Sequence, residues 1–160
     1  MDKSVVREIL KGKNKKIAKL GNAVQKDLAP ENIHKFRVEI KRLRSFLRLL
    51  AADKSYKEIK LPKKLKKLYD ICGTIREAQL EQKKIAEIKL VLPAYAAHLS
   101  LQINKQRKIW ASHYDKDGIN KLKKKIQDSK IPELSPDALH LFICDSLLNI
   151  KKTVQGNPCQ

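Results

Sequence analysis

The chain has 160 residues, and its 36 Lys and Arg outnumber 17 Asp and Glu, so its net charge is +19 at neutral pH. This length fits one domain with an appended piece, and a hydrophobic fraction of 42% argues against disorder. Only 5% of the residues are aromatic, and five Gly and six Pro are few for the turns of a β-sandwich or barrel. An all-α protein is therefore predicted.

The excess of positive charge predicts binding to polyanions, for which nucleic acid, an anionic membrane surface and inorganic polyphosphate are the candidates. Cys72, Cys144 and Cys159 are odd in number and widely spaced, which favours neither a disulfide framework nor a zinc site. The sequence shows no signal-peptide pattern and no apolar run near the ~18 residues that span a bilayer. We therefore expect a cytoplasmic protein without membrane insertion.

Two helices are predicted in the first third of the chain. Apolar residues recur there at helical steps of three, four and seven, namely at Val6, Leu10, Ile17, Leu20, Val24 and Leu28. Pro30 is placed to open a second helix, which is expected from about residue 31 to residue 52. Residues 53–60 are polar and are expected to form a loop.

Two further long helices are expected after this loop. Pro62 opens the third, which should reach about residue 91 along the apolar line Leu65, Leu68, Ile71, Cys72, Ile75, Ala78, Ile85 and Ile88. Pro93 starts or kinks the fourth, whose apolar residues include Ala96, Leu99, Ile103, Trp110 and Tyr114. We expect Cys72, Trp110 and Tyr114 to be core residues.

The last part of the chain differs in charge. Asp117-Gly118 is predicted to interrupt the fourth helix before 119–126, and Ile131-Pro132 is a break. Ser135 is then a good helix cap with Pro136 at the first helical position, and this final helix should reach about residue 154. Residues 131–160 carry a net charge of −1, so residues 1–130 carry +20.

These elements predict an antiparallel bundle of four long helices plus a shorter C-terminal helix, because the connections between them are short. The change in charge divides the chain into a basic helical bundle over 1–130 and an apolar C-terminal helix and tail over 131–160.

The second helix carries one basic face, which we call the basic stripe: His34, Arg37, Lys41, Arg44 and Arg48. The spacings of 3, 4, 3 and 4 place these side chains within an arc of roughly 80°. The adjoining arc is apolar, so the stripe borders the core, and it contains no carboxylate. Four of the seven arginines lie between positions 37 and 48, and the planar donor fork of Arg suits phosphate oxygens.

The order H-x-x-R-x-x-x-K-R-L-R over residues 34–44 resembles the signature of the CHAD domain, the conserved histidine α-helical domain. Residues 71–77 are similar to the second motif of that family, a Gly followed closely by Arg-Asp, although Glu77 replaces the Asp. The resemblance implies an all-helical protein that binds inorganic polyphosphate and associates with polyphosphate granules. It implies binding roles for His34, Arg37, Lys41, Arg44 and Arg76.

Members of this family commonly contain two such bundles, each of which opens with a His-containing motif. Around His140 the offsets of the first motif fall on Ile143, Leu147 and Ile150, so every basic position is apolar. The chain thus resembles a short, single-bundle member with a degenerate start of a second bundle. Two roles stay open for the last helix: it could pair two chains as a homodimer, or it could cap the bundle.

We therefore predict non-enzymatic binding of inorganic polyphosphate, or of another polyanion, by His34, Arg37, Lys41, Arg44, Arg48 and Arg76. Additional contacts are expected from Lys13, Lys63 and Lys67, and Glu77 is expected to orient a side chain of the stripe. The sequence has no Gly-rich phosphate loop, paired carboxylates or metal-ligand spacing, so no catalytic residue, metal or cofactor is expected.

Two alternatives belong to other classes of function. A helical nucleic-acid-binding protein is compatible with the charge, but no aromatic residue is interleaved with the basic stripe to stack on bases. A protein-interaction module could instead dock a partner through the apolar C-terminal helix. Competition by nucleic acid and the oligomeric state would separate these readings from polyphosphate binding.

Overall fold

The computed structural model describes residues 2–52, 60–88, 92–114 and 136–155. The elements in these ranges are helices: α1 (Lys3–Lys26), α2 (Pro30–Leu50), α3 (Lys63–Glu87), α4 (Pro93–His113) and α6 (Pro136–Gln155). The described ranges contain no strand, which confirms the predicted all-α fold. None of their helices is long and apolar enough to cross a membrane.

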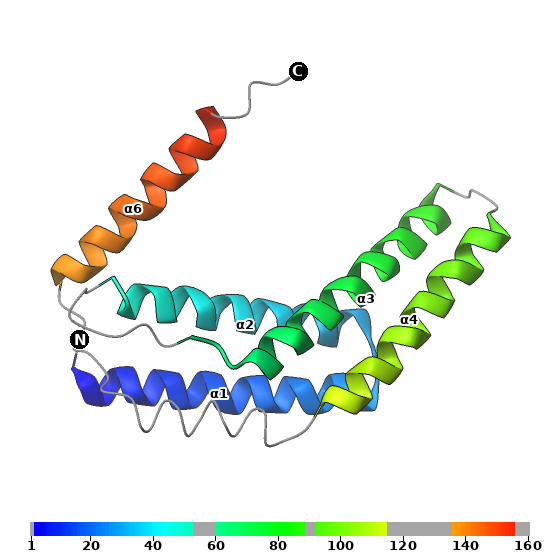
Figure 1. Cartoon of the computed structure of the whole chain (residues 1–160), viewed down its shortest axis with the longest axis horizontal. Coiled ribbons are helices and arrows are strands. Elements are labelled where there is room, and N and C mark those ends of the chain that lie inside the picture. The colour runs from blue at the N-terminus through cyan, green and yellow to red at the C-terminus, as the bar shows by residue number, and fades with distance from the viewer. Residues whose placement is uncertain (1, 53–59, 89–91, 115–135, 156–160) are drawn as a thin grey trace.

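The helices form two antiparallel pairs. Helices α1 and α2 lie side by side, and α3 crosses them before it turns with α4 into a projecting hairpin (Figure 1). Helix α6 contacts α2 near the other end of the molecule and then points away from it. It has 20 residues against 21 in α2 and in α4, so the C-terminal helix is scarcely shorter than these two.

Prolines set several helix starts, as the sequence predicts. Pro30, Pro93 and Pro136 are each the first residue of a helix, where the missing backbone N–H costs nothing. Pro62 precedes α3 as its N-cap, and this helix ends at Glu87. The predicted Ser135 cap, the break at 131–132 and the interrupted helix over 117–126 lie outside the described residues.

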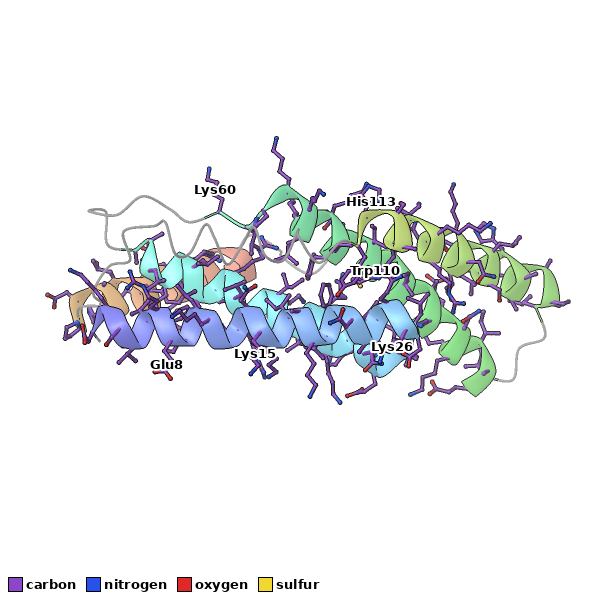
Figure 2. All side chains as sticks on the ribbon, turned by 90° about the horizontal axis from the view of Figure 1, so that it is seen from below. Glu8, Lys15, Lys26, Lys60, Trp110 and His113 are labelled. Carbon is purple, nitrogen blue, oxygen red and sulfur yellow. The ribbon has the colours of Figure 1, made fainter. Side chains whose placement is uncertain are left out.

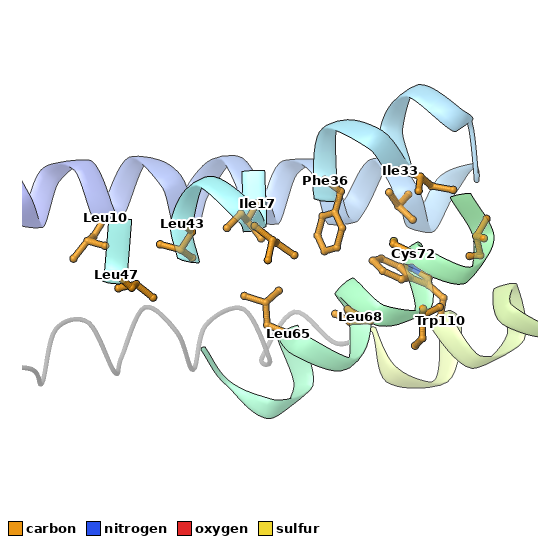
Figure 3. Packing of buried hydrophobic residues seen from close by; sticks show 14 of the residues in the cluster. Leu10, Ile17, Ile33, Phe36, Leu43, Leu47, Leu65, Leu68, Cys72 and Trp110 are labelled. Atoms are coloured by element: carbon orange, nitrogen blue, oxygen red, sulfur yellow. The ribbon is translucent and has the colours of Figure 1, made fainter. Parts of the chain in front are cut away.

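The core joins the first three helices and the end of α4. Figure 3 shows Ile17 of α1 and Phe36 of α2 pointing towards α3, which carries Leu65, while Leu10 of α1 lies beside Leu47 of α2. Trp110 is also buried here, as predicted, and packs edge-on against Phe36 with 5.3 Å between ring centroids. Polar side chains such as Glu8 and Lys15 point outward from α1 (Figure 2).

The C-terminal end of α4 is fixed to α1 by Tyr114. This half-buried ring stacks on Trp110, and its hydroxyl donates a hydrogen bond of 2.7 Å to Oδ1 of Asn22. A Cβ on Gly21 would lie 2.8 Å from Cε2 of Tyr114, so the glycine makes room for the ring. The core role predicted for Tyr114 is therefore confirmed in part, because the ring packs against the core without being fully buried.

Helix α6 leaves most of its apolar surface open. Ala138 is buried, but five large apolar side chains are between 42% and 60% exposed: Leu139, Leu141, Ile143, Leu147 and Leu148. No side chain described for α6 belongs to the core cluster. The described part of α6 therefore packs on α2 through Ala138 and Phe142 and leaves its other large apolar side chains exposed, so both roles predicted for this helix stay open.

Candidate anion-binding site

A groove of about 330 Å³ lies between α2 and α3, and we call it the α2–α3 groove. Its cations come from both sides: Arg44 and Arg48 from α2, Lys66 from α3, and Lys60 from the segment before α3. Of these, Figure 2 labels Lys60. The remaining lining residues are Ile40, Leu47, Leu61 and Tyr69. Two of the five stripe residues, Arg44 and Arg48, therefore line a hollow with an apolar wall.

Three of the cations that line the groove have no acidic partner among the described side chains. Arg44, Arg48 and Lys66 are exposed, and none forms an ion pair with a side chain in the described ranges. The adjacent wall, formed by Ile40 and Leu47, is buried and apolar. A charge beside such a wall is less screened than one in open water, so the groove concentrates positive potential that an anion can neutralise.

Arg37 has a different environment from the rest of the stripe. Its Nη1 donates a hydrogen bond of 2.9 Å to the backbone oxygen of Tyr69, and its guanidinium lies 4.4 Å from the centroid of the Tyr69 ring. The same Nη1 would lie 2.5 Å from a Cβ on Gly73. Arg37 is therefore half-buried against α3, with part of its donor capacity already used within the protein.

Lys41 faces a second, shallower hollow of about 470 Å³. The lining combines cations of α1 and α2 with apolar side chains of α2 and α6: Lys13, Val38, Lys41, Arg42, Ser45, Phe46, Leu49 and Phe142. The basic stripe therefore does not face one continuous channel. Its end at Arg44 and Arg48 lines one hollow, and its middle at Lys41 lines another.

Glu39 forms ion pairs with two of the cations that line this second hollow, Lys13 and Arg42. Its buried carboxylate lies 3.0 Å from Nζ of Lys16, 3.6 Å from Nζ of Lys13 and 3.7 Å from Nη1 of Arg42. Burial opposes ionisation of Glu39, but the hydrogen bond from Lys16 and the nearby positive charges hold its pKa below the usual value. Lys13, an expected ligand contact, is thus engaged in an intramolecular ion pair.

The other predicted site residues are spread along α2 and α3. His34 is exposed and lines neither hollow, and Arg76 is half-buried on α3. Lys63 and Lys67 are exposed but do not line the α2–α3 groove, where Lys60 and Lys66 stand instead.

Glu77 does not have the orienting role expected for it. It is exposed and forms no ion pair with any side chain in the described ranges. The carboxylate that holds cations of α1 and α2 is Glu39, which pairs with Lys13, Lys16 and Arg42 rather than with the stripe.

Sequence reasoning missed Tyr69 and Lys66 as groove residues. A usable signal was present, because Lys66 and Tyr69 precede Gly73 by seven and four residues. These spacings place all three on one helix face. Taking the glycine of the second motif as the residue that meets α2 would have identified that face.

The sequence pattern of the CHAD domain matches residues 8–154, and the chain therefore belongs to the CHAD domain family. The match spans both the basic bundle and most of α6. The CHAD domain is known in the context of polyphosphate binding and metabolism. Neither the curated proteins nor the solved structures contain a match to this chain.

Proposed function

We propose that the protein binds inorganic polyphosphate in the α2–α3 groove and acts by binding alone. The observation that carries this proposal is the convergence of Arg44, Arg48 and Lys66 from two helices on one hollow, without a carboxylate partner among the described residues. Membership of the CHAD domain family supports the class of ligand. Such a role would place the protein with polyphosphate granules in the cytoplasm.

The proposed binding is electrostatic. Arg44 and Arg48 present planar donor forks that can each hold two phosphate oxygens, and Lys66 faces them from α3. The stripe from His34 to Arg48 extends about 21 Å along α2, at 1.5 Å per residue. Because Lys41 lines the other hollow and Arg37 is packed against Tyr69, the proposed site is the end of the stripe at Arg44 and Arg48. Release of counterions from the ligand makes its affinity fall steeply with salt.

Titration with polyphosphate of one defined chain length, at several salt concentrations, tests this proposal. The variant Arg44→Gln/Arg48→Gln should bind at least about tenfold more weakly and with a shallower salt dependence, because charge-assisted contacts are lost. The matched control is Arg7→Gln/Arg107→Gln, which removes two exposed arginines from α1 and α4. Equal losses in both double variants would show that net charge, and not the groove, holds the ligand.

A second candidate function, docking of another copy of this chain, is favoured by the exposed apolar side chains of α6. Within the bounds of α6 the sequence has two Asp (Asp137 and Asp145) and two Lys (Lys151 and Lys152), so the helix carries no net charge and two copies could meet there without the repulsion expected between their basic bundles. Light scattering should give a dimer mass that Ile143→Glu converts to a monomer mass. The control Leu101→Glu alters an apolar position on α4 that is even more exposed than Ile143, and it should leave the mass unchanged.

A further inference from the structure

The α2–α3 groove has an apolar side that a chain of phosphates would not use. Tyr69 and Leu61 are both half-buried and both line the groove beside its cations. In the sequence no aromatic residue is interleaved with the basic stripe, but the packing of α3 against α2 brings one to it. A ligand that contacts the whole groove would combine negative charge with a flat apolar part.

We propose that the groove holds a single nucleoside 5′-polyphosphate, with its phosphates on Arg44 and Arg48 and its base against Tyr69 and Leu61. The phosphate half of this inference rests on the proposed function. Binding of the base rests on other residues, Tyr69 and Leu61, so it can fail while phosphate binding stands.

The ring of Tyr69 is held in place from the protein side. The guanidinium of Arg37 covers one face of the ring. Arg37 is itself fixed to α3, because its Nη1 donates a hydrogen bond to the backbone oxygen of Tyr69. A ring that is already ordered loses little entropy when a base packs against its remaining surface. Stacking on an aromatic ring contributes to the binding of any base, because every base has a flat π-face.

The size of the groove favours one nucleotide over a nucleic-acid strand. Its volume of about 330 Å³ is at the lower end of small-molecule sites. Tyr69 is the one aromatic residue among the described lining residues, so the groove offers stacking to one base. Successive bases of a strand would need further rings along the same path.

Comparison of ATP with inorganic tripolyphosphate, both measured by calorimetry in one magnesium-free buffer, isolates the contribution of the nucleoside. The two ligands share a triphosphate chain. We expect ATP to bind at least about fivefold more tightly, a factor typical of modest base stacking. Tyr69→Leu should lower the affinity for ATP far more than that for tripolyphosphate and so remove this difference, whereas Tyr69→Phe should keep it. Tyr95→Leu, an exposed tyrosine of α4, is the matched control.

The outcomes separate this inference from the proposed function. If neither ligand binds in the groove, the proposed function fails and this inference fails with it. If ATP and tripolyphosphate bind equally, or if Tyr69→Leu weakens both alike, the nucleotide inference is overturned while phosphate binding stands. Single-stranded RNA that binds far more tightly than ATP would also overturn it. Thermal melts of each variant verify that the helical fold is retained.

Discussion

The side chain that Gly73 lacks would occupy the space filled by the guanidinium of Arg37. A Cβ at Gly73 would lie 2.5 Å from Nη1 of Arg37, the atom that donates to the backbone oxygen of Tyr69. Arg37 belongs to the first motif of the sequence and Gly73 to the second, which lie on α2 and α3. The two motifs are therefore parts of one interhelical contact, and that contact orders the ring that lines the groove.

The substitution Gly73→Ala should displace Arg37 rather than unfold the protein, because the blocked atom is the end of a flexible side chain. Alanine gains about 0.5–1 kcal/mol over glycine inside a helix, whereas the lost hydrogen bond and cation–π contact together cost about 1–2.5 kcal/mol. We expect a small net loss of stability in urea unfolding, of about 1 kcal/mol. The control Gly12→Ala, which has open space around it, should instead stabilise the protein by about 0.5–1 kcal/mol.

A double-mutant cycle makes the coupling between Gly73 and Arg37 measurable. In an Arg37→Ala background the obstacle is absent, so Gly73→Ala should stabilise the protein about as much as Gly12→Ala does. An effect of Gly73→Ala that is the same in both backgrounds would show that the two residues are independent.

Stability should depend on pH through Glu39. Its pKa is lower in the folded protein than the usual value of 4.5, so its contribution is fully present above pH 4.5 and is lost as the pH falls through the folded-state pKa. Glu39→Gln should cost about 1 kcal/mol at pH 7, since Lys16 and Arg42 are largely exposed and remain solvated. The difference in unfolding free energy between Glu39→Gln and the unmodified protein should become smaller in acid, because Glu39 is then protonated.

Glu31→Gln is the control for Glu39→Gln. Glu31 lies on the same helix and pairs with Lys35 at 3.1 Å, but its side chain is 67% exposed. Its substitution should change the unfolding free energy by less than about 0.5 kcal/mol at either pH. A pH dependence as large for Glu31 as for Glu39 would contradict the role given to the buried carboxylate.

Cys72 should be unreactive in the folded protein. Burial raises the pKa of its thiol to about 12, an effect that the nearby charge of Arg37 opposes only in part, so almost no thiolate forms at pH 8. Iodoacetamide followed by peptide mass spectrometry should modify Cys144, which is half-buried, well before Cys72. In urea the two should be modified at similar rates. Rapid labelling of Cys72 without denaturant would contradict its burial.

Trp110 should be the most costly single side chain to remove. It is fully buried and packs against Phe36 and Tyr114, so Trp110→Ala should destabilise the protein by about 3–5 kcal/mol in urea unfolding. Trp110→Phe should cost clearly less, because it retains a ring and removes Nε1, which has no hydrogen-bond partner among the described residues. Equal costs would mean that the ring contacts are not what anchors α4.

Much of the fold follows from local patterns in the sequence. Val6, Leu10 and Ile17 are spaced for one buried helix face, and the structure buries all three. Pro30 and Pro136 mark helix starts because proline is tolerated at the first helical position. By contrast, the partial exposure of Tyr114 depends on where α4 meets α1, which no local pattern specifies.

The candidate site could be predicted only along one helix. Spacing alone places Arg44 and Arg48 on the face of α2 that borders the core, since 3.6 residues per turn fix which side chains share a face. The same spacing cannot show that Arg37 turns towards α3. That depends on Gly73 and Tyr69, which are more than thirty residues away in the chain.

The sequence by itself therefore determined the helical class, the basic stripe and the two motifs that mark the family, because each is a property of consecutive turns of one helix. The tertiary structure decided which cations are left for a ligand. Helix α1 lies where Lys13 and Lys16 meet Glu39, and α3 lies where Lys66 and Tyr69 meet the end of α2. Ion pairs and grooves form between helices. The residues that meet there are therefore set by how the helices pack against one another, and not by the periodicity within one helix.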